Sequence, residues 1–320
     1  MLLPLLNPSD LTTEQEVRWC PGCGDFSILA QMKNVFAGLG VPREKLVVVS
    51  GIGCAGRLPY YLNTYGFHTI HGRAPAVATG IKIANPDLQV WVVTGDGDAL
   101  GAGGSHLLHA LRRNVDIKIL LFNNEVFGLT KGQHSPTSRT GTRTRTSPDG
   151  SVDAPLRPLT LALAADASFV ARTIDVDVDH LTETLRRAAA HRGSAFVEIY
   201  QNCKVFNDGV FDYATDKDMK ADSLIHLEHG KPLVFGKDRH RAIRLRGLTP
   251  EIITLNGHSD ALVHDEQADL MHALLLSRLV GPDFPECVGV LRAVQRPTFA
   301  EQRLGPSQLS LDGDESWMVE

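Results

Sequence analysis

Four of the five cysteines in this 320-residue chain stand in short motifs with glycine, proline or polar neighbours. Cys20 and Cys23 form a Cys-x-x-Cys pair, Cys54 ends a Gly-Ile-Gly-Cys sequence, and Cys203 ends a Gln-Asn-Cys sequence. Four thiolates are the usual ligand set of a [4Fe–4S] cluster. We therefore interpret these four as cluster ligands, and Cys287, which lies outside such motifs, as an ordinary buried thiol.

The same cysteines could instead bind zinc, or could be buried without any metal. Structural zinc sites usually draw their ligands from two close pairs. Here one close pair is combined with two single cysteines that are far apart in the chain. This spacing favours an iron–sulfur cluster that is held against a second cofactor.

A second group of residues suits a diphosphate and its metal ion. Asp96 lies in a Gly-Asp-Gly-Asp sequence, and Asn124 is the second residue of a later Asn-Asn pair. Mg²⁺ prefers oxygen ligands, which the Asp96 carboxylate, the Asn124 amide and the Val126 backbone carbonyl can supply. Gly95 and Gly97 allow the backbone to approach phosphates closely. The pattern is typical of a thiamine diphosphate site, and the alternative is a glycine-rich turn with an unrelated asparagine pair.

Several residues beside these motifs are further candidates. His71 precedes an expected helix, so it either contacts the thiazolium ring of the cofactor or simply begins the helix. Thr130 and Gln133 follow the asparagine pair and could reach the phosphate side. The predicted cofactor-binding residues, with His71 as the catalytic candidate, are Ile52, Gly53, His71, Gly95, Gly97, Asp98, Thr130 and Gln133.

The elements that must position these residues alternate along the chain. Short apolar runs predict strands at 45–50, 88–94, 117–122, 168–172 and 195–200, and helical patterns occur at 26–39, 74–84, 104–113 and 180–192. This alternation predicts an α/β fold with a doubly wound, mostly parallel sheet. Because the motifs follow strands, we expect them to meet at the carboxyl edge of that sheet.

The rest of the chain is less regular. Segment 131–157 is polar, and a loop of this length is usually functional or disordered. Its Arg139, Arg143 and Arg145 could pair with an anionic substrate or coenzyme A, or could simply be solvated. Beyond residue 204 the clearest helical pattern is at 265–278. We therefore predict a cofactor-binding domain, residues 1–204, and a C-terminal appendage, residues 205–320, that packs on a partner.

Composition narrows the functional class. Hydrophobic residues make up 43% and charged residues 22%, and the net charge of −5 gives no electrostatic reason to bind nucleic acid or anionic membrane. No apolar run approaches the roughly 18 residues of a membrane span. The first ten residues lack a basic segment and contain two prolines, unlike a signal peptide. Thiolate ligands must stay reduced, so we expect a cytoplasmic protein.

In these motifs the chain resembles the β subunits of two-subunit 2-oxoacid:ferredoxin oxidoreductases. The similarity covers approximately residues 15–212, and its motifs occur in order at 19–25, 51–54, 71–74, 95–98 and 120–133. The resemblance implies a thiamine diphosphate-binding fold. It also implies a [4Fe–4S] cluster on Cys20, Cys23, Cys54 and Cys203, and Mg²⁺ on Asp96, Asn124 and the carbonyl of Val126.

The resemblance also implies a reaction. Members of this family oxidatively decarboxylate a 2-oxoacid, release CO₂, transfer the acyl group to coenzyme A and pass electrons through the cluster to ferredoxin, reversibly. Residues 139–212 look most like members that use 2-oxoglutarate and form succinyl-CoA. Pyruvate or another 2-oxoacid is the alternative substrate.

One half of a thiamine diphosphate site is missing from the sequence. Such enzymes use a carboxylate on a second domain that holds the aminopyrimidine ring, and this chain carries only the diphosphate-binding half. We therefore expect a partner subunit, and the resemblance implies that it is an α subunit in an α2β2 heterotetramer. A non-redox subunit of the acetolactate synthase kind is a rival that does not explain the four cysteines. A structural zinc protein is a second alternative, which explains the cysteines but not the Mg²⁺ motif.

Overall fold

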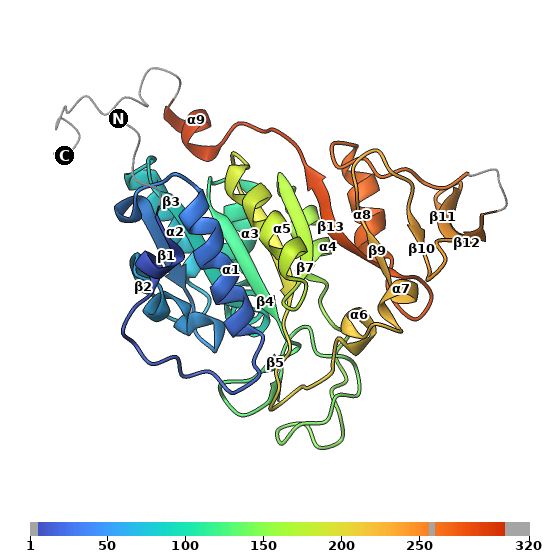
Figure 1. Ribbon diagram of the computed structural model, residues 1–320, viewed down its shortest axis with the longest axis horizontal. Helices are drawn as coiled ribbons and strands as arrows, with labels where there is room; N and C mark the ends of the chain where they lie inside the picture. Colours follow the sequence, from blue (N-terminus) through green and yellow to red (C-terminus); the bar gives the residue numbers. More distant parts are fainter. Residues whose placement is uncertain (1–5, 256–259, 305–320) are drawn as a thin grey trace.

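The computed structural model describes residues 6–255 and 260–304, and within them an eight-stranded sheet forms the centre of the molecule (Figure 1). Its strand order is β2-β1-β3-β4-β8-β7-β13-β9. The first six strands in that order run parallel, whereas β13 is antiparallel to β7 and parallel to β9. The strands are β1 (Leu46–Ser50), β2 (Tyr65–His68), β3 (Gln89–Gly95), β4 (Lys118–Asn123), β7 (Phe169–Ile174), β8 (Ala195–Tyr200), β9 (Leu224–His226) and β13 (Glu286–Ala293).

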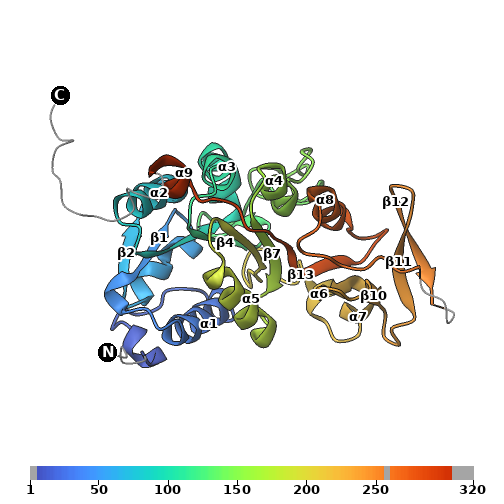
Figure 2. The ribbon, with the colours of Figure 1, turned by 90° about the horizontal axis from the view of Figure 1, so that it is seen from above.

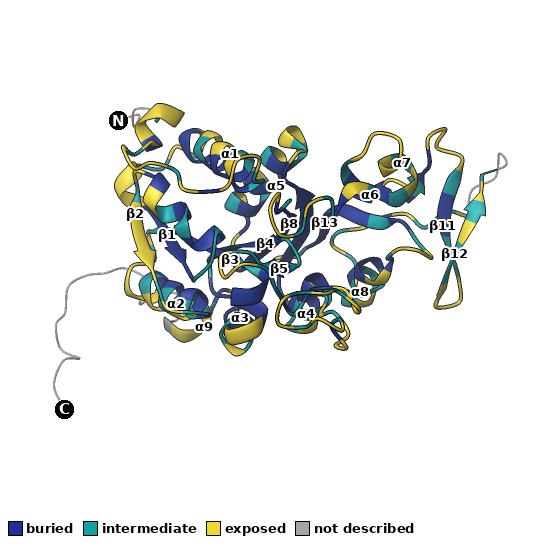
Figure 3. Cartoon of the chain, turned by 90° about the horizontal axis from the view of Figure 1, so that it is seen from below, coloured by how far each residue is buried: buried dark blue, intermediate teal, exposed yellow. Residues whose placement is uncertain are grey.

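The inner strands form because their sequences are continuous apolar runs. Every residue of β1, β4, β7 and β8 is buried, as expected for parallel strands that are covered on both faces (Figure 3). The edge strand β2, by contrast, is exposed throughout. The five predicted strands are all present, with ends within two residues of the expected positions. The predicted doubly wound, mostly parallel α/β fold is therefore confirmed.

Helices cover the two faces of the sheet and create two apolar cores (Figure 2). Successive side chains of β4 alternate between them, so that Ile119 and Leu121 join one core and Leu120 and Phe122 the other. Helices α1 (Asp25–Gly38) and α5 (Val178–Ala190) lie on one face. The other face carries α2 (Ala74–Ala84), α3 (Gly104–Arg112), α4 (Pro158–Ala164) and α8 (Leu270–Arg278).

Helix α8 is shorter than predicted. The pattern indicated a helix from residue 265, but α8 begins at Leu270. The reason is the preceding Asp269, whose carboxylate accepts a hydrogen bond from the backbone N–H of Met271 at 2.9 Å. Aspartate is favoured at this capping position because it satisfies an amide that has no partner within the helix.

The C-terminal part of the chain completes the sheet and extends beyond it. Strands β9 and β13 add to the edge at β7, and a separate three-stranded sheet, β10-β11-β12, stands at one end of the molecule (Figures 1 and 2). The domain boundary at residue 204 stays a prediction. The remaining elements of this part are α6 (Asp212–Thr215), α7 (Lys220–Ser223), β10 (Val234–Phe235), β11 (Arg241–Arg246), β12 (Thr249–Thr254) and α9 (Phe299–Leu304).

Parts of two predictions fall outside the described residues. Residues 1–5 belong to the N-terminal segment that lacks the features of a signal peptide, and residues 256–259 and 305–320 belong to the predicted appendage. Among the helices of the described ranges, none has the length and apolar character needed to cross a membrane.

A buried ion-pair network joins three strands near the carboxyl edge of β8. Arg172 on β7 places Nε 2.8 Å from Glu198 of β8 and a terminal nitrogen 3.2 Å from Glu286 of β13. The Arg172 side chain is 7% exposed and that of Glu198 is 1% exposed. Burial alone would lower the pKa of Arg172, but the neighbouring carboxylates hold it well above its usual range.

We therefore expect Arg172→Met to destabilise the chain strongly. The substitution removes the ion-pair partner of the buried Glu198 carboxylate and of the mostly buried Glu286 carboxylate, a change that typically costs about 3–5 kcal/mol. The matched control is Arg186→Met, because the Arg186 side chain is 59% exposed and only 4.0 Å from Glu183. Urea unfolding measures both variants. Equal loss of stability in the two would contradict a special role for the buried network.

Candidate active site

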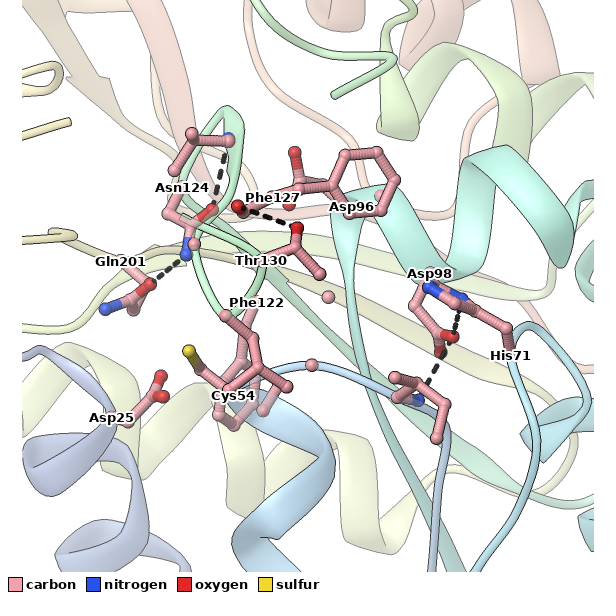
Figure 4. Close-up of a pocket in the computed structure, with 18 residues that line it drawn as sticks. Asp25, Cys54, His71, Asp96, Asp98, Phe122, Asn124, Phe127, Thr130 and Gln201 are labelled. Atoms are coloured by element: carbon pink, nitrogen blue, oxygen red, sulfur yellow. Dashed lines mark hydrogen bonds and ion pairs between the residues drawn. The ribbon is translucent and has the colours of Figure 1, made fainter. Parts of the chain in front are cut away.

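A pocket opens where β1, β3 and β4 end, as expected for a parallel sheet (Figure 4). It encloses about 480 Å³ of free space, including its opening to solvent. Cys20, Cys23, Cys203 and Gln133 are the predicted site residues that do not line it. Those that do are Ile52, Gly53, Cys54, His71, Gly95, Asp96, Gly97, Asp98, Asn124, Val126 and Thr130.

Asp96 is held by the loop that follows the asparagine pair. It lies directly after β3 and is 2% exposed. Its Oδ2 accepts hydrogen bonds from Ser135 Oγ and Thr137 Oγ1, both at 2.5 Å. Burial raises the pKa of Asp96 to about 6, and the two hydroxyl donors oppose that rise. The two hydrogen bonds fix the orientation of the carboxylate. Because burial disfavours its negative charge, a cation beside it would stabilise the charged form.

Asn124 and Val126 stand on the neighbouring strand end. The pairing of Gly95 with Phe122 places the end of β4 beside Asp96. Asn124 Oδ1 accepts from the Val126 N–H at 3.2 Å, in a turn that precedes the short strand β5 (Val126–Phe127). Asp96, Asn124 and Val126 thus all line one pocket. The carboxylate, amide oxygen and backbone carbonyl that they can offer suit the hard ion Mg²⁺.

Asp98 lines the pocket and also holds the surrounding loops together, and its predicted contact with a cofactor stays a prediction. Its Oδ1 accepts from the backbone N–H groups of Ile52 at 3.1 Å and Gly72 at 2.8 Å. Its Oδ2 accepts from Thr94 Oγ1 at 2.6 Å. His71 Nδ1 lies 2.6 Å from Asp98 Oδ1, and the His71 side chain remains 42% exposed at the pocket. Asp98 therefore joins the loops that carry Ile52 and Gly72 to strand β3, and its carboxylate lies beside His71.

The glycines of the Gly-Asp-Gly-Asp loop serve two purposes. A Cβ added at Gly97 would lie 2.3 Å from the Phe127 ring, so the loop needs glycine there in order to pack on Phe127. At Gly95 the nearest protein atom to an added Cβ is the Phe122 carbonyl at 4.0 Å. Gly95 therefore has free space beside it, as close approach of a cofactor requires.

Thr130 and Gln133 bind each other. Thr130 Oγ1 donates to Gln133 Oε1, and Gln133 Nε2 donates back to the Thr130 carbonyl at 2.8 Å. Gln133 lies on β6 (Gln133–His134), which pairs with β5. Thr130 lines the pocket, whereas the hydrogen bonds of Gln133 make it a support of the turn that carries Thr130.

The four motif cysteines converge beside this pocket, although their ligand role stays a prediction. A Cβ added at Gly128 would lie 3.4 Å from Cys203 Sγ and 3.8 Å from Cys54 Sγ, so these thiols flank one glycine. Burial and then Asp25 raise the pKa of Cys54 to about 12, with smaller contributions from Cys203 and Cys20. Burial also raises the pKa of Cys23, and Cys54 and Cys203 add to that effect.

These thiols fit a cluster chemically. A bound metal deprotonates a coordinating thiol even where burial would keep it protonated. Across residues 6–255 and 260–304, no three His, Cys, Asp or Glu side chains are gathered as they would be around a single metal ion. A four-iron cluster is larger than one ion and spreads its ligands more widely. Cys287 is remote in sequence and buried in the apolar core on β13.

Comparison with known proteins gives the family. Residues 51–199 match the model of the thiamine pyrophosphate enzyme, C-terminal TPP binding domain. The 2-oxoglutarate oxidoreductase subunit KorB of Mycobacterium tuberculosis is 49% identical over 97% of this chain and 88% of that protein. The chain is a 2-oxoacid:ferredoxin oxidoreductase β subunit. The family and the enzyme class that the motifs predicted are thus confirmed.

Two further proteins agree with this membership. The subunit beta of 2-oxoacid:ferredoxin oxidoreductase 1 of Aeropyrum pernix is 50% identical over 61% of this β subunit and 62% of that protein. A solved structure of the 2-oxoglutarate:ferredoxin oxidoreductase from Magnetococcus marinus, with 2-oxoglutarate, coenzyme A and succinyl-CoA bound, is 34% identical. It superposes with a TM-score of 0.76 and covers 93% of this chain and 88% of that one.

Several residues of the β subunit's site were not predicted. Ser135 and Thr137 lie in segment 131–157, in which Gln133 and three arginines are the predicted functional residues. Asp25 is 1% exposed, lines the pocket and has a pKa that burial raises to about 7. Gln201 also lines the pocket. The available signal was their position, because Asp25 and Gln201 stand within two residues of a motif cysteine.

We expect Ser135 and Thr137 to support metal binding through Asp96. Replacing them together by alanine and valine should weaken Mg²⁺-dependent binding of thiamine diphosphate roughly tenfold or more, because hydrogen bonds to a charged group contribute about 1.5–3 kcal/mol. The control is Thr142→Val in the same loop, whose hydroxyl donates to the Arg139 carbonyl instead. Isothermal titration calorimetry compares the variants. Wild-type affinity in the double variant would refute this role.

Proposed function

We propose that this chain is the β subunit of a 2-oxoglutarate:ferredoxin oxidoreductase. The enzyme would convert 2-oxoglutarate and coenzyme A to succinyl-CoA and CO₂ reversibly, with ferredoxin as electron acceptor. The observation that carries the proposal is the position of Cys54, which lines the pocket with Asp96 and Asn124 and also flanks Gly128 with Cys203. A cluster held by the cysteines would therefore stand next to the cofactor in the pocket.

The residues of the pocket have distinct proposed tasks. Asp96, Asn124 and the Val126 carbonyl would hold Mg²⁺ and, through it, the diphosphate. With Nδ1 directed to Asp98, His71 would present Nε2 to the substrate. When bound, thiamine diphosphate supplies the electron sink for decarboxylation, and a [4Fe–4S] cluster on Cys20, Cys23, Cys54 and Cys203 supplies a path for single electrons.

The partner completes the site. This chain supplies the diphosphate half, so we propose an α subunit that supplies the aminopyrimidine half in an α2β2 heterotetramer. Residues 205–320 would pack on it, and the complex would work in the cytoplasm, where thiolate ligands stay reduced. The similarity to the Magnetococcus marinus enzyme, whose solved structure has 2-oxoglutarate and coenzyme A bound, supports the proposed substrates.

The proposed arginine contacts need the partner as well. Arg139 Nε lies 3.1 Å from Glu125 Oε2, and a terminal nitrogen donates to the Val210 carbonyl at 2.7 Å, so this guanidinium is already engaged. Arg143 and Arg145 are exposed, and neither of them lines the pocket. We therefore propose that the cation for the distal carboxylate of 2-oxoglutarate comes from the α subunit.

A steady-state comparison tests the proposal. The reconstituted complex is assayed with coenzyme A, a low-potential acceptor and either 2-oxoglutarate or pyruvate. We expect a higher kcat/KM for 2-oxoglutarate, and no turnover by the β subunit alone. A higher kcat/KM for pyruvate would overturn the substrate, and turnover by the isolated chain would overturn the need for a partner.

A further inference from the structure

We infer that Gln201 is a positioning residue that acts on both cofactor sites, an inference that rests on the proposed function. Gln201 follows β8 directly and is 1% exposed. Its Nε2 donates to Cys23 Sγ at 3.2 Å and to the Asn202 carbonyl at 2.7 Å. Its Oε1 accepts from Asn124 Nδ2 at 2.7 Å. One amide group thus connects a proposed cluster ligand to a proposed Mg²⁺ ligand.

The partners of Gln201 determine which way its amide points. A backbone carbonyl can only accept hydrogen bonds, and so can a cysteine thiolate that binds a cluster, so the NH₂ group of Gln201 must face Asn202 and Cys23. The amide oxygen then faces Asn124. The opposite orientation would place oxygen against sulfur and lose both bonds, together with the bond to Asn124.

The orientation of Gln201 in turn determines that of Asn124. Because Gln201 presents an oxygen, Asn124 must offer its NH₂ group to it, and this leaves the Asn124 amide oxygen for other partners. That oxygen already accepts from the Val126 N–H at 3.2 Å and has a second lone pair. If Asn124 were reversed, it would present NH₂ to a cation. Gln201 therefore ensures that Asn124 offers oxygen to Mg²⁺.

On the other side, Gln201 acts on a cluster through Cys23. A hydrogen bond to a ligating sulfur stabilises negative charge on the cluster, and the reduced cluster carries more of that charge. The bond from Gln201 should therefore raise the reduction potential and favour acceptance of an electron from the neighbouring cofactor.

The packing of Gln201 keeps these contacts in place. A Cβ added at Gly24 would lie 3.1 Å from Gln201 Cγ, so the side chain passes close to the backbone of the Cys-x-x-Cys loop. The Gln201 N–H donates to the Asn123 carbonyl at 2.9 Å, which continues the pairing of β8 with β4. The backbone and the side chain of Gln201 are thus both held in place between the proposed cluster site and the proposed Mg²⁺ site.

Two variants separate the two effects. Gln201→Met keeps a similar shape but removes the bonds to Cys23 and Asn124. Gln201→Glu keeps an oxygen for Asn124 but loses the donor to sulfur. Gln31→Met is the matched control, because Gln31 is a buried, hydrogen-bonded glutamine of α1 whose partners are Asn34 and Thr182.

The reconstituted αβ complex is compared by iron content, redox titration of the cluster and calorimetric binding of thiamine diphosphate with Mg²⁺. We expect a more negative midpoint potential in both Gln201 variants. Cofactor affinity should fall roughly tenfold in Gln201→Met, as for the loss of one positioning hydrogen bond, and change less in Gln201→Glu. Gln31→Met should match the wild type in both measurements.

The outcomes distinguish this inference from the proposed function. Wild-type complex without iron or without thiamine diphosphate binding would refute the proposed function itself. If the wild-type complex contains iron and binds thiamine diphosphate, but the midpoint potential is unchanged in the iron-loaded Gln201 variants, the proposed effect of Gln201 on the cluster is refuted. Unchanged cofactor affinity in Gln201→Met would refute the positioning of Asn124.

Discussion

Cys203→Ser is expected to abolish the brown colour and iron content of the complex, and with them the reduction of ferredoxin. Cys203 is 9% exposed and shares the space beside Gly128 with Cys54, so no solvent ligand easily replaces its thiolate. A serine hydroxyl is a poor substitute, because iron–sulfur clusters are held by thiolates. The variant should still bind thiamine diphosphate, since the proposed Mg²⁺ ligands Asp96 and Asn124 are unchanged.

Cys287→Ser is the matched control for this experiment. Cys287 is also buried, but it lies on β13 within the apolar core rather than beside the pocket. Anaerobic purification followed by iron and zinc analysis and absorption spectroscopy measures both variants. Unchanged iron in Cys203→Ser would overturn the ligand assignment, and zinc in place of iron in the wild type would favour a structural zinc protein.

The central strands could be predicted because their signal is local. A strand that is covered on both faces must be apolar throughout, so β4 and β8 appear in the sequence as continuous apolar runs. The carboxyl edge then follows from the topology of parallel sheets, which is why Cys54, Asp96 and Asn124 could be expected at one pocket.

The far edge of the sheet could not be predicted in the same way. Strand β13 pairs with β7 from more than a hundred residues away, and no local pattern indicates an antiparallel partner at that distance. The short strand β9 is held in turn by β13. Both depend on long-range pairing, which the hydrophobic pattern alone does not encode.

The motifs predicted which residues lie at the site, but they often did not show which hydrogen bonds those residues make. Asp98 lies in the Gly-Asp-Gly-Asp motif, and only the structure shows that its carboxylate accepts hydrogen bonds from Ile52, Gly72 and Thr94. The sequence places Gln201 near a motif cysteine, but only the fold shows that it bonds to Cys23 and that Thr137 bonds to Asp96. Hydrogen-bond partners depend on positions in space, so a motif can locate a site without showing which of its residues bind and which support.

Asp96→Ala should remove Mg²⁺-dependent binding of thiamine diphosphate. Asp96 is the one anionic ligand in the proposed metal site, where Asn124 and Val126 offer neutral oxygens. Without it, the charge of metal and diphosphate is poorly balanced, and Ser135 and Thr137 lose their common acceptor. We expect affinity to fall at least about 100-fold, equivalent to roughly 2.7 kcal/mol. Asp96→Asn keeps an oxygen of similar position and should lose less.

The control for Asp96→Ala is Asp87→Ala, which removes a carboxylate that is 73% exposed and lies 3.4 Å from Lys45. Calorimetry with Mg²⁺ present should give wild-type affinity for this control. Asp96→Ala should keep its iron, because the proposed cluster ligands are all cysteines, just as Cys203→Ser should keep its thiamine diphosphate. If each variant loses one cofactor and keeps the other, the cluster site and the thiamine diphosphate site are separate, although Cys54 lies beside both. Wild-type cofactor affinity in Asp96→Ala would refute the Mg²⁺ site, and loss of both cofactors in either variant would show that the two sites do not form independently.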